Sequence, residues 1–244
     1  MIPLGRWPGP QGMELDGARF LVAGATGEFG AALARELSEQ GCELAVLGRD
    51  RERLEGLAGE LSATSGRFDA RDRAGIEGAV DALAAGLGGL DGVVVAVGAA
   101  AFGAGGDLSL ETVEDVFAIN TLAPIALVSA ALPHLPDDGA IVGVTAIVAD
   151  HPTAGLAAYS ASKAAFSAYL AVLRRERRRA GGTVLDVRPP HMDTAFAERA
   201  LTGEPPPLPE PVDHLEVVAR TIAALREGRR ELAWDLESRA LVTR

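Results

Sequence analysis

The chain contains a single cysteine, Cys42, among its 244 residues. One cysteine cannot form an internal disulfide, so the fold does not depend on oxidative cross-links and suits a reducing compartment. Cys42 lies where a loop enters the apolar run LAVL and has no nearby histidine, which indicates a small buried core thiol and not a nucleophile. We therefore expect a cytoplasmic protein.

Basic residues are also scarce, with 23 lysines and arginines against 34 aspartates and glutamates. The formal net charge of −11 would repel nucleic acids and anionic membranes, so we expect neither as a partner. The one basic run, RRERRR at residues 174–179, closes a predicted helix, where cations offset the negative end of the helix dipole. It indicates a solvated helix end in preference to a phosphate-binding patch.

Long uninterrupted apolar segments are absent as well. The longest uncharged run, residues 116–136, is broken by Asn120 and by prolines, which favours a buried helix over a bilayer helix. The amino-terminal MIPLGRWPGPQG is proline-rich and too short in apolar length for a signal peptide, so we predict a flexible extension over residues 1–14. Residues 15–244 are then expected to form one domain.

Short apolar runs alternate with longer helical patterns along the chain. The runs are RFLVAG, ELAVLG, GVVVAVG, AIVGVT and TVLDVRP. This rhythm predicts parallel strands joined by crossover helices, and fully apolar strands require a sheet covered on both faces. The predicted fold is α/β, a single-domain, doubly wound Rossmann fold with a mostly parallel central sheet.

The first apolar run leads into GATGEFG, which places Gly24, Gly27 and Gly30 at a strand-to-helix turn. Missing side chains there let backbone N–H groups and a helix amino terminus approach a pyrophosphate. A tight turn with close helix packing would need the same glycines. The position in the first βαβ unit favours dinucleotide binding.

The second apolar run ends in GRD, about twenty residues beyond the glycines, where an adenosine ribose would lie. Arg49 could bind a 2′-phosphate, whereas Asp50 could accept from a free 2′-hydroxyl. Both residues could also belong to a solvated helix start. Because Gly48 leaves room for a phosphate, NADP(H) is favoured and NAD(H) stays open; no metal site is predicted.

Tyr159 precedes Lys163 by four residues in the run AAYSASKAA, so both side chains share one face of a predicted helix. A nearby ammonium would stabilise phenolate and lower a tyrosine pKa that starts near ~10. This spacing predicts a proton-transfer site.

Taken in order, GATGEFG, GRD, RFDARD, FAIN, YSASK and VRPPHMDT resemble the short-chain dehydrogenase/reductase family from Leu15 onward. The resemblance implies that Tyr159 is the general acid/base toward a carbonyl or alcohol. It also implies that Lys163 binds the nicotinamide ribose and lowers the tyrosine pKa, and that Asn120 holds a water in the proton relay.

Three cofactor contacts follow from the same resemblance: Asp69 with the adenine, Thr194 with the nicotinamide amide or a phosphate, and Gly98 at the end of the fourth strand. Simpler alternatives remain, because Asn120 could only interrupt a helix, Asp69 could cap one and Thr194 could be a loop residue. Residues 195–213, rich in proline, are predicted to cover the substrate pocket.

The sequence also departs from the family. The glycine spacing is that of its extended members, and the usual NNAG and PG segments appear as VAVG and PP. The serine that normally lies thirteen residues before the tyrosine is Ala146. Thr145 should point to the opposite face of its strand, which leaves His151 or His191 as replacement donors.

These patterns predict an NADP(H)-dependent oxidoreductase that acts on a small carbonyl or secondary alcohol. The alternative is a dinucleotide-binding module with little turnover, which the loss at Ala146 would favour. Two apolar helical runs, within residues 116–132 and 164–173, cannot be buried by one side of a sheet, so a homodimer or homotetramer is expected.

Overall fold

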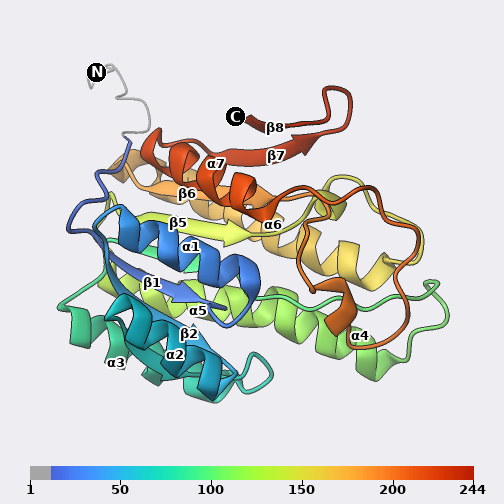
Figure 1. Ribbon diagram of the computed structural model, residues 1–244, viewed down its shortest axis with the longest axis horizontal. Coiled ribbons are helices and arrows are strands. Elements are labelled where there is room, and N and C mark those ends of the chain that lie inside the picture. The colour runs from blue at the N-terminus through green and yellow to red at the C-terminus, as the bar shows by residue number, and fades with distance from the viewer. Residues whose placement is uncertain (1–11) are drawn as a thin grey trace, which may run out of the picture.

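The computed structural model describes residues 12–244, so the extension predicted for residues 1–14 lies almost wholly outside the described residues. The described strands form one sheet in the order β3-β2-β1-β4-β5-β6-β7-β8 (Figure 1). They are β1 (Arg19–Ala23), β2 (Glu43–Gly48), β3 (Thr64–Arg67), β4 (Gly92–Val95), β5 (Ala140–Val144), β6 (Thr183–Arg188), β7 (Glu231–Asp235) and β8 (Ala240–Thr243). Every neighbouring pair is parallel except β7 and β8, which confirms the predicted doubly wound α/β fold.

Helices cover both faces of this sheet, as the fully apolar strands require. The α-helices are α1 (Glu28–Glu39), α2 (Arg51–Leu61), α3 (Ile76–Leu87), α4 (Leu110–Phe117), α5 (Ala123–Ala131), α6 (Ala157–Arg177) and α7 (His214–Arg226). Side chains of α1, α2 and α7 pack on one face, and those of α3, α5 and α6 pack on the other.

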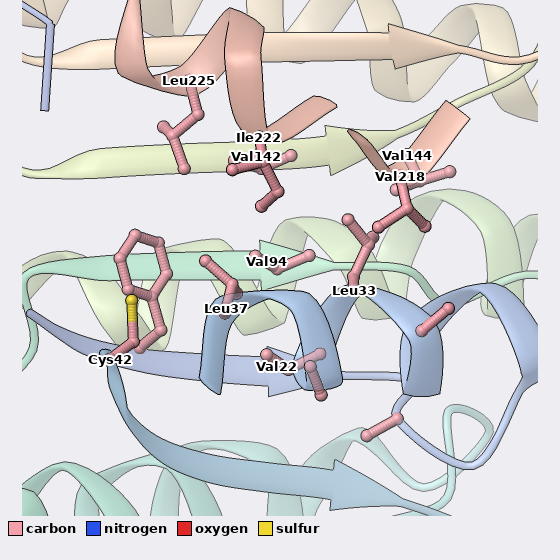
Figure 2. Close-up of a cluster of buried hydrophobic side chains, with 14 of the residues drawn as sticks. Val22, Leu33, Leu37, Cys42, Val94, Val142, Val144, Val218, Ile222 and Leu225 are labelled. Carbon is pink, nitrogen blue, oxygen red and sulfur yellow. The ribbon is translucent and has the colours of Figure 1, made fainter. Parts of the chain in front are cut away.

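Alternate residues of each strand supply the two cores. In β1, Phe20 and Val22 face the α1 and α7 side, whereas Leu21 and Ala23 face the opposite side. Figure 2 shows the first of these cores, in which side chains of α1 and α7 meet those of β1, β4 and β5. The packing of this core holds β1, β4 and β5 in place against α1 and α7.

Cys42 belongs to the core on the α1 side (Figure 2). Its thiol is buried and donates to the Leu15 carbonyl at a distance of 3.2 Å. Burial raises the pKa of Cys42 to about 12, so the thiolate nucleophile is not formed at neutral pH. The predicted buried core thiol is confirmed.

α4, the π-helical turn η2 (Ala118–Leu122), α5 and the 3₁₀ turn η3 (Leu132–His134) follow one another without a break. By length and composition alone, Leu110–His134 is apolar enough to cross a membrane, and 50% of its most apolar window is buried inside the protein. Leu127 and Val128 are fully buried among residues of α3 and the sheet. This burial agrees with the buried helix predicted for residues 116–136.

Two arginines in the basic run at the end of α6 make hydrogen bonds to the backbone, whereas a solvated helix end was predicted. Arg174 donates to the carbonyls of Val184 and Arg230, and Arg177 donates to those of Pro136 and Asp137. These two guanidiniums therefore fasten the helix end to neighbouring loops.

Candidate active site

A cleft of about 810 Å³ runs along the carboxyl ends of the parallel strands. Its lining extends from the glycine turn after β1, past the ends of β2 and β4, to Tyr159 and the segment after β6. The strand order reverses between β1 and β4, and ligands of open α/β sheets bind at such a point. The volume is that of an ordinary small-molecule site of about 300–1,000 Å³.

The glycine turn depends on close backbone approach. Gly24 has φ +89°, and a Cβ on it would lie 2.5 Å from the Ala96 carbonyl oxygen. A Cβ on Gly30 would lie 2.3 Å from the Gly24 oxygen, whereas Gly27 has ordinary space. Gly27 also begins α1 without a side-chain cap, which leaves the amino end of that helix open to an anion.

The end of β2 brings Arg49 to the wall of the same cleft. A Cβ on Gly48 would lie 2.4 Å from the Thr26 side chain, so glycine is needed where β2 passes the turn. Asp50 caps α2, because its carboxylate accepts from the Arg53 amide at 3.1 Å. This bond occupies one oxygen of the Asp50 carboxylate, which is the alternative ligand for the ribose.

Asp69 lines the cleft after β3, and its carboxylate accepts from the Arg71 amide at 2.9 Å in a local turn. Thr194 lies in the segment after β6 and also lines the cleft, with its amide bonded to the Met192 carbonyl at 2.8 Å. Asp69 and Thr194 therefore line the cleft and are each held by a local hydrogen bond.

Tyr159 stands in the first turn of α6 and is half-buried at the apolar end of the cleft. Its ring centroid lies 6.0 Å from that of Phe196. Burial raises the pKa of Tyr159 above its ordinary value. This effect is opposite to the lowering of the Tyr159 pKa expected from a neighbouring ammonium.

Lys163, one turn further along α6, is the only lysine in the chain. Its side chain is buried, and Nζ donates to the carbonyls of Val144 at 3.0 Å and Val97 at 3.4 Å. Burial lowers the pKa of Lys163 to about 8, while the carboxylate of Asp186 acts in the opposite direction. The ammonium therefore titrates close to neutral pH.

Asn120 is fully buried within the π-helical turn η2. Its Oδ1 accepts from the Ala99 amide at 2.8 Å, and its Nδ2 donates to the Ala99 carbonyl at 2.9 Å and to Ser162 Oγ at 3.0 Å. Asn120 thus ties the end of β4 to α6, which is more than interrupting a helix. Gly98, in the same β4 segment, lies directly against Lys163 and Asn120.

Ala146 is buried in an apolar cluster near Tyr159. The other buried members of this cluster are Ala100, Phe102, Val148 and Leu156. Thr145 also lines the cleft, but it donates its hydroxyl to Asp186 at 2.6 Å, which commits that hydroxyl to a buried network.

The two histidines considered as replacement donors both line the cleft. His151 is exposed in the loop after β5. His191 Nδ1 lies 3.0 Å from the Pro209 carbonyl oxygen, and since a carbonyl only accepts, Nδ1 carries the proton. The remaining Nε2 of His191 can then donate only when the imidazole is protonated.

Residues 195–213 pass the carboxyl ends of the strands (Figure 1), and many of them line the cleft. Glu28, in the glycine turn, joins this segment to α1: it accepts from the Ala195 amide at 2.9 Å and from Arg199 at 3.0 Å. Sequence reasoning missed this link, although an acidic residue inside a phosphate-binding turn was a visible anomaly.

The β7–β8 hairpin adds residues to the cleft that sequence reasoning also missed, namely Trp234, Leu236 and Arg239. Neither strand was predicted, so nothing in the sequence pattern placed these side chains at the carboxyl edge. Trp234 and Leu236 add apolar surface to the cleft, and Arg239 adds a positive charge.

One group of potential metal ligands lies outside the cleft among the described residues, formed by Asp193, Asp213 and His214. Asp213 caps α7 through the Leu215 amide, and His214 Nδ1 lies 2.7 Å from the Asp193 carboxylate. These contacts give all three side chains structural partners.

Known proteins resemble the chain over most of its length. A family model described as short chain dehydrogenase matches residues 19–205. An uncharacterized oxidoreductase of Staphylococcus epidermidis is 28% identical over 188 residues, which cover 75% of this chain and 82% of the relative. The cyclic-di-GMP-binding biofilm dispersal mediator protein of Escherichia coli is 30% identical over 180 residues, covering 73% of this chain and 74% of the relative.

Solved structures show the same relationship. A short chain dehydrogenase from Burkholderia cenocepacia in complex with NADP has a TM-score of 0.79 at 28% identity, covering 88% of this chain and 94% of that one. Blue fluorescent protein from a metagenomic library, in complex with NADPH, has a TM-score of 0.79 at 27% identity, covering 91% and 98%.

Proposed function

The chain belongs to the short-chain dehydrogenase/reductase family, and from this premise we propose that it is an NADP(H)-dependent oxidoreductase. It transfers hydride between the nicotinamide and a carbonyl or secondary alcohol of a small molecule. The observation that carries the proposal is the convergence of Tyr159 and Lys163 at one end of a cleft whose other end is the glycine turn, with the buried Asn120 bonded to Ser162 of the same helix.

The residues of the cleft fit a nicotinamide dinucleotide. Gly24 and Gly30 let the turn backbone pack closely, since a Cβ on either would meet backbone atoms, and the amino end of α1, which has no side-chain cap, suits a pyrophosphate. Asp69 and Thr194 also line the cleft, where Asp69 would meet the adenine and Thr194 the nicotinamide half. A bound nicotinamide supplies or accepts the hydride.

The protein's own residues handle the proton. Tyr159 Oη protonates the developing alkoxide in reduction, and accepts the alcohol proton in the reverse direction. Lys163 Nζ holds the nicotinamide ribose and adds a positive charge beside the phenol. Its two bonds to backbone carbonyls fix it in place, and Asn120 keeps α6 in register with the β4 end.

Arg49 and Asp50 both line the cleft, but NADP(H) is favoured over NAD(H) because the Asp50 carboxylate is partly occupied in capping α2. The solved relatives that contain NADP or NADPH support the same choice. An anionic 2′-phosphate at Arg49 would gain a charge-assisted bond that a free hydroxyl does not offer.

Titration of the purified protein with NADPH and NADH, followed by nicotinamide fluorescence, tests the proposal directly. A panel of carbonyl substrates is then screened for oxidation of the preferred cofactor, with Tyr159→Phe as the control. NADPH binding with Tyr159-dependent turnover is the expected result. Binding without any turnover would support the alternative, a dinucleotide-binding module, which the apolar surroundings of Ala146 favour.

A further inference from the structure

A buried polar network lies behind the sole lysine of the chain. Asp186, on β6, has no exposed surface and accepts three hydrogen bonds. They come from Thr145 Oγ1 at 2.6 Å, Ser167 Oγ at 2.6 Å and Arg188 Nε at 2.8 Å. A fully buried carboxylate is costly unless it is paired, so its retention at this depth calls for a role.

Two independent connections bring Asp186 next to Lys163. Ser167 follows Lys163 by one turn of α6, so their side chains lie on the same helical face. Thr145 follows Val144, whose carbonyl accepts from the Lys163 ammonium at 3.0 Å. Of the two hydroxyls that bind Asp186, that of Ser167 therefore lies one helical turn from Lys163, and that of Thr145 belongs to the residue after the Val144 acceptor.

Arg188 does not neutralise Asp186 alone, because it serves three carboxylates. Its guanidinium also lies 2.7 Å from Asp150 and 3.3 Å from Glu231. Glu231 is shared further with Arg174 at 3.5 Å and with the exposed Arg244 at 3.9 Å. Part of the Asp186 charge is thus left to act on other groups nearby.

The group that needs this charge is Lys163, whose ammonium bonds only to backbone carbonyls among the described residues and is deeply buried. Asp186 opposes the effect of burial on the pKa of Lys163. Tyr159, one turn earlier on α6, carries no charge at neutral pH and offers no compensation.

We propose that Asp186 is a positioning residue that keeps Lys163 in its charged form and so maintains the Tyr159–Lys163 pair. The role of that pair rests on the proposed function. The electrostatic link between Asp186 and Lys163 does not depend on it, so the two can be tested separately.

Because the chain has one lysine, labelling lysine with ¹³C at Cε gives a single side-chain NMR signal. The midpoint of the pH titration of its chemical shift reports the pKa of Lys163 alone. Asp186→Asn should lower the midpoint by about one pH unit, since one buried negative charge is lost from the layer next to the ammonium. Thr145→Val removes a hydroxyl donor but keeps that charge, so its midpoint should stay at the wild-type value.

Arg188→Gln should shift the titration midpoint of Lys163 in the opposite direction. It also tests the proposal if Asp186→Asn does not fold. Removing the guanidinium leaves the Asp186 charge less compensated, so the midpoint should rise. An unchanged midpoint in Asp186→Asn, an equal drop in Thr145→Val, or a fall in Arg188→Gln would overturn the proposal, because a merely structural network predicts no dependence on the sign of the charge.

NADPH titration separates this proposal from the proposed function. Asp186→Asn should bind NADPH several-fold more weakly at pH 8 and recover most of its affinity at pH 6.5, where Lys163 is protonated in both proteins. If wild-type protein does not bind NADPH, the proposed function fails while the NMR midpoints still decide the role of Asp186. If binding occurs but the midpoints do not move, the role of Asp186 fails alone.

Discussion

Gly98 lies so close to the Lys163 ammonium that an added Cβ would require the ammonium to move. A Cβ built on Gly98 would lie 3.0 Å from Lys163 Nζ and 3.3 Å from Asn120 Oδ1. The segment after β4 therefore limits the position of the ammonium from one side, while the Val144 carbonyl holds it from the other. The glycine is needed here for space and not for an unusual backbone angle.

Gly98→Ala should consequently push Lys163 from its position and weaken NADPH binding. Loss of one hydrogen bond from a charged group, about 1.5 kcal/mol, corresponds to roughly a tenfold higher Kd. Titration with NADPH, followed by nicotinamide fluorescence, measures this Kd. Gly86→Ala, on α3 with no atom within 4 Å of the added Cβ, is the matched control and should bind normally. Equal Kd values for the two variants would contradict the packing argument.

Arg49→Ala should weaken NADPH far more than NADH, because only NADPH has a 2′-phosphate to lose. A charge-assisted contact of about 1.5–3 kcal/mol predicts a selectivity change of roughly ten- to a hundredfold. Arg51→Ala is the control, since Arg51 is exposed, pairs with Glu55 at 3.9 Å and does not line the cleft. If NADH binds better than NADPH in the wild type, Asp50 is the ribose ligand and the assignment of Arg49 is wrong.

The affinity for NADPH should depend on pH through Lys163. Burial depresses the pKa of this amine to about 8, so the charged form is complete below that value and is lost as the pH rises through it. Since the anionic cofactor favours the ammonium, affinity should be constant at pH 6 to 7 and fall through about pH 8 to 9. Titrations across this range measure the effect, and a flat profile would exclude Lys163 as the titrating contact.

The sequence predicted the fold, and the presence of Tyr159 and Lys163 at one end of the cleft, because these signals are local. Fully apolar strands determine a covered parallel sheet, and the four-residue spacing of Tyr159 and Lys163 depends only on helix geometry. The link of Glu28 to Arg199 joins residues 171 positions apart, and no local pattern reports such a pair. β7 and the edge strand β8 were missed for a related reason: both are only partly buried and lack the apolar run that marked the central strands.

The pKa of Tyr159 shows a second limit. The spacing predicted that an ammonium would lower it, but the sequence does not report how deeply a phenol is buried. In the folded protein burial dominates and raises it, since the Lys163 ammonium is turned toward the Val97 and Val144 carbonyls.

Assembly should occur through the exposed side of α5 and α6. Leu122, just before α5, and Val172, on α6, are 43% and 52% exposed, and Ser129 and Tyr169 link the two helices at 3.4 Å. We expect a homodimer or homotetramer, because apolar side chains on one face favour contact with a second copy.

Sedimentation velocity at micromolar concentration measures the assembly. The double variant Leu122→Lys with Val172→Lys should sediment as a smaller species than the wild type. Leu215→Lys is the control, because Leu215 is 57% exposed but lies on α7 at the opposite face of the sheet. A wild-type monomer, or an assembly unaffected by the double variant, would rule out this interface.

The last prediction concerns the hydroxyl missing at Ala146. Losing one preorganised donor toward a developing oxyanion typically costs ~10² to 10³ in rate, so wild-type turnover should be slow. Ala146→Ser adds an oxygen beside Tyr159 in an otherwise apolar cluster, where it lowers thermal stability slightly but should raise kcat for a reducible substrate. NADPH affinity should stay near the wild-type value.

Variants of the two histidines decide whether another donor already fills this role. If His191→Ala or His151→Ala abolishes turnover while Ala146→Ser gives no gain, a histidine has replaced the serine. Because His191 Nδ1 donates to Pro209, a donor role for its Nε2 requires imidazolium. A gain in Ala146→Ser that disappears when Tyr159→Phe is added would instead show that the tyrosine supplies the proton and that the cleft lacked only the second donor.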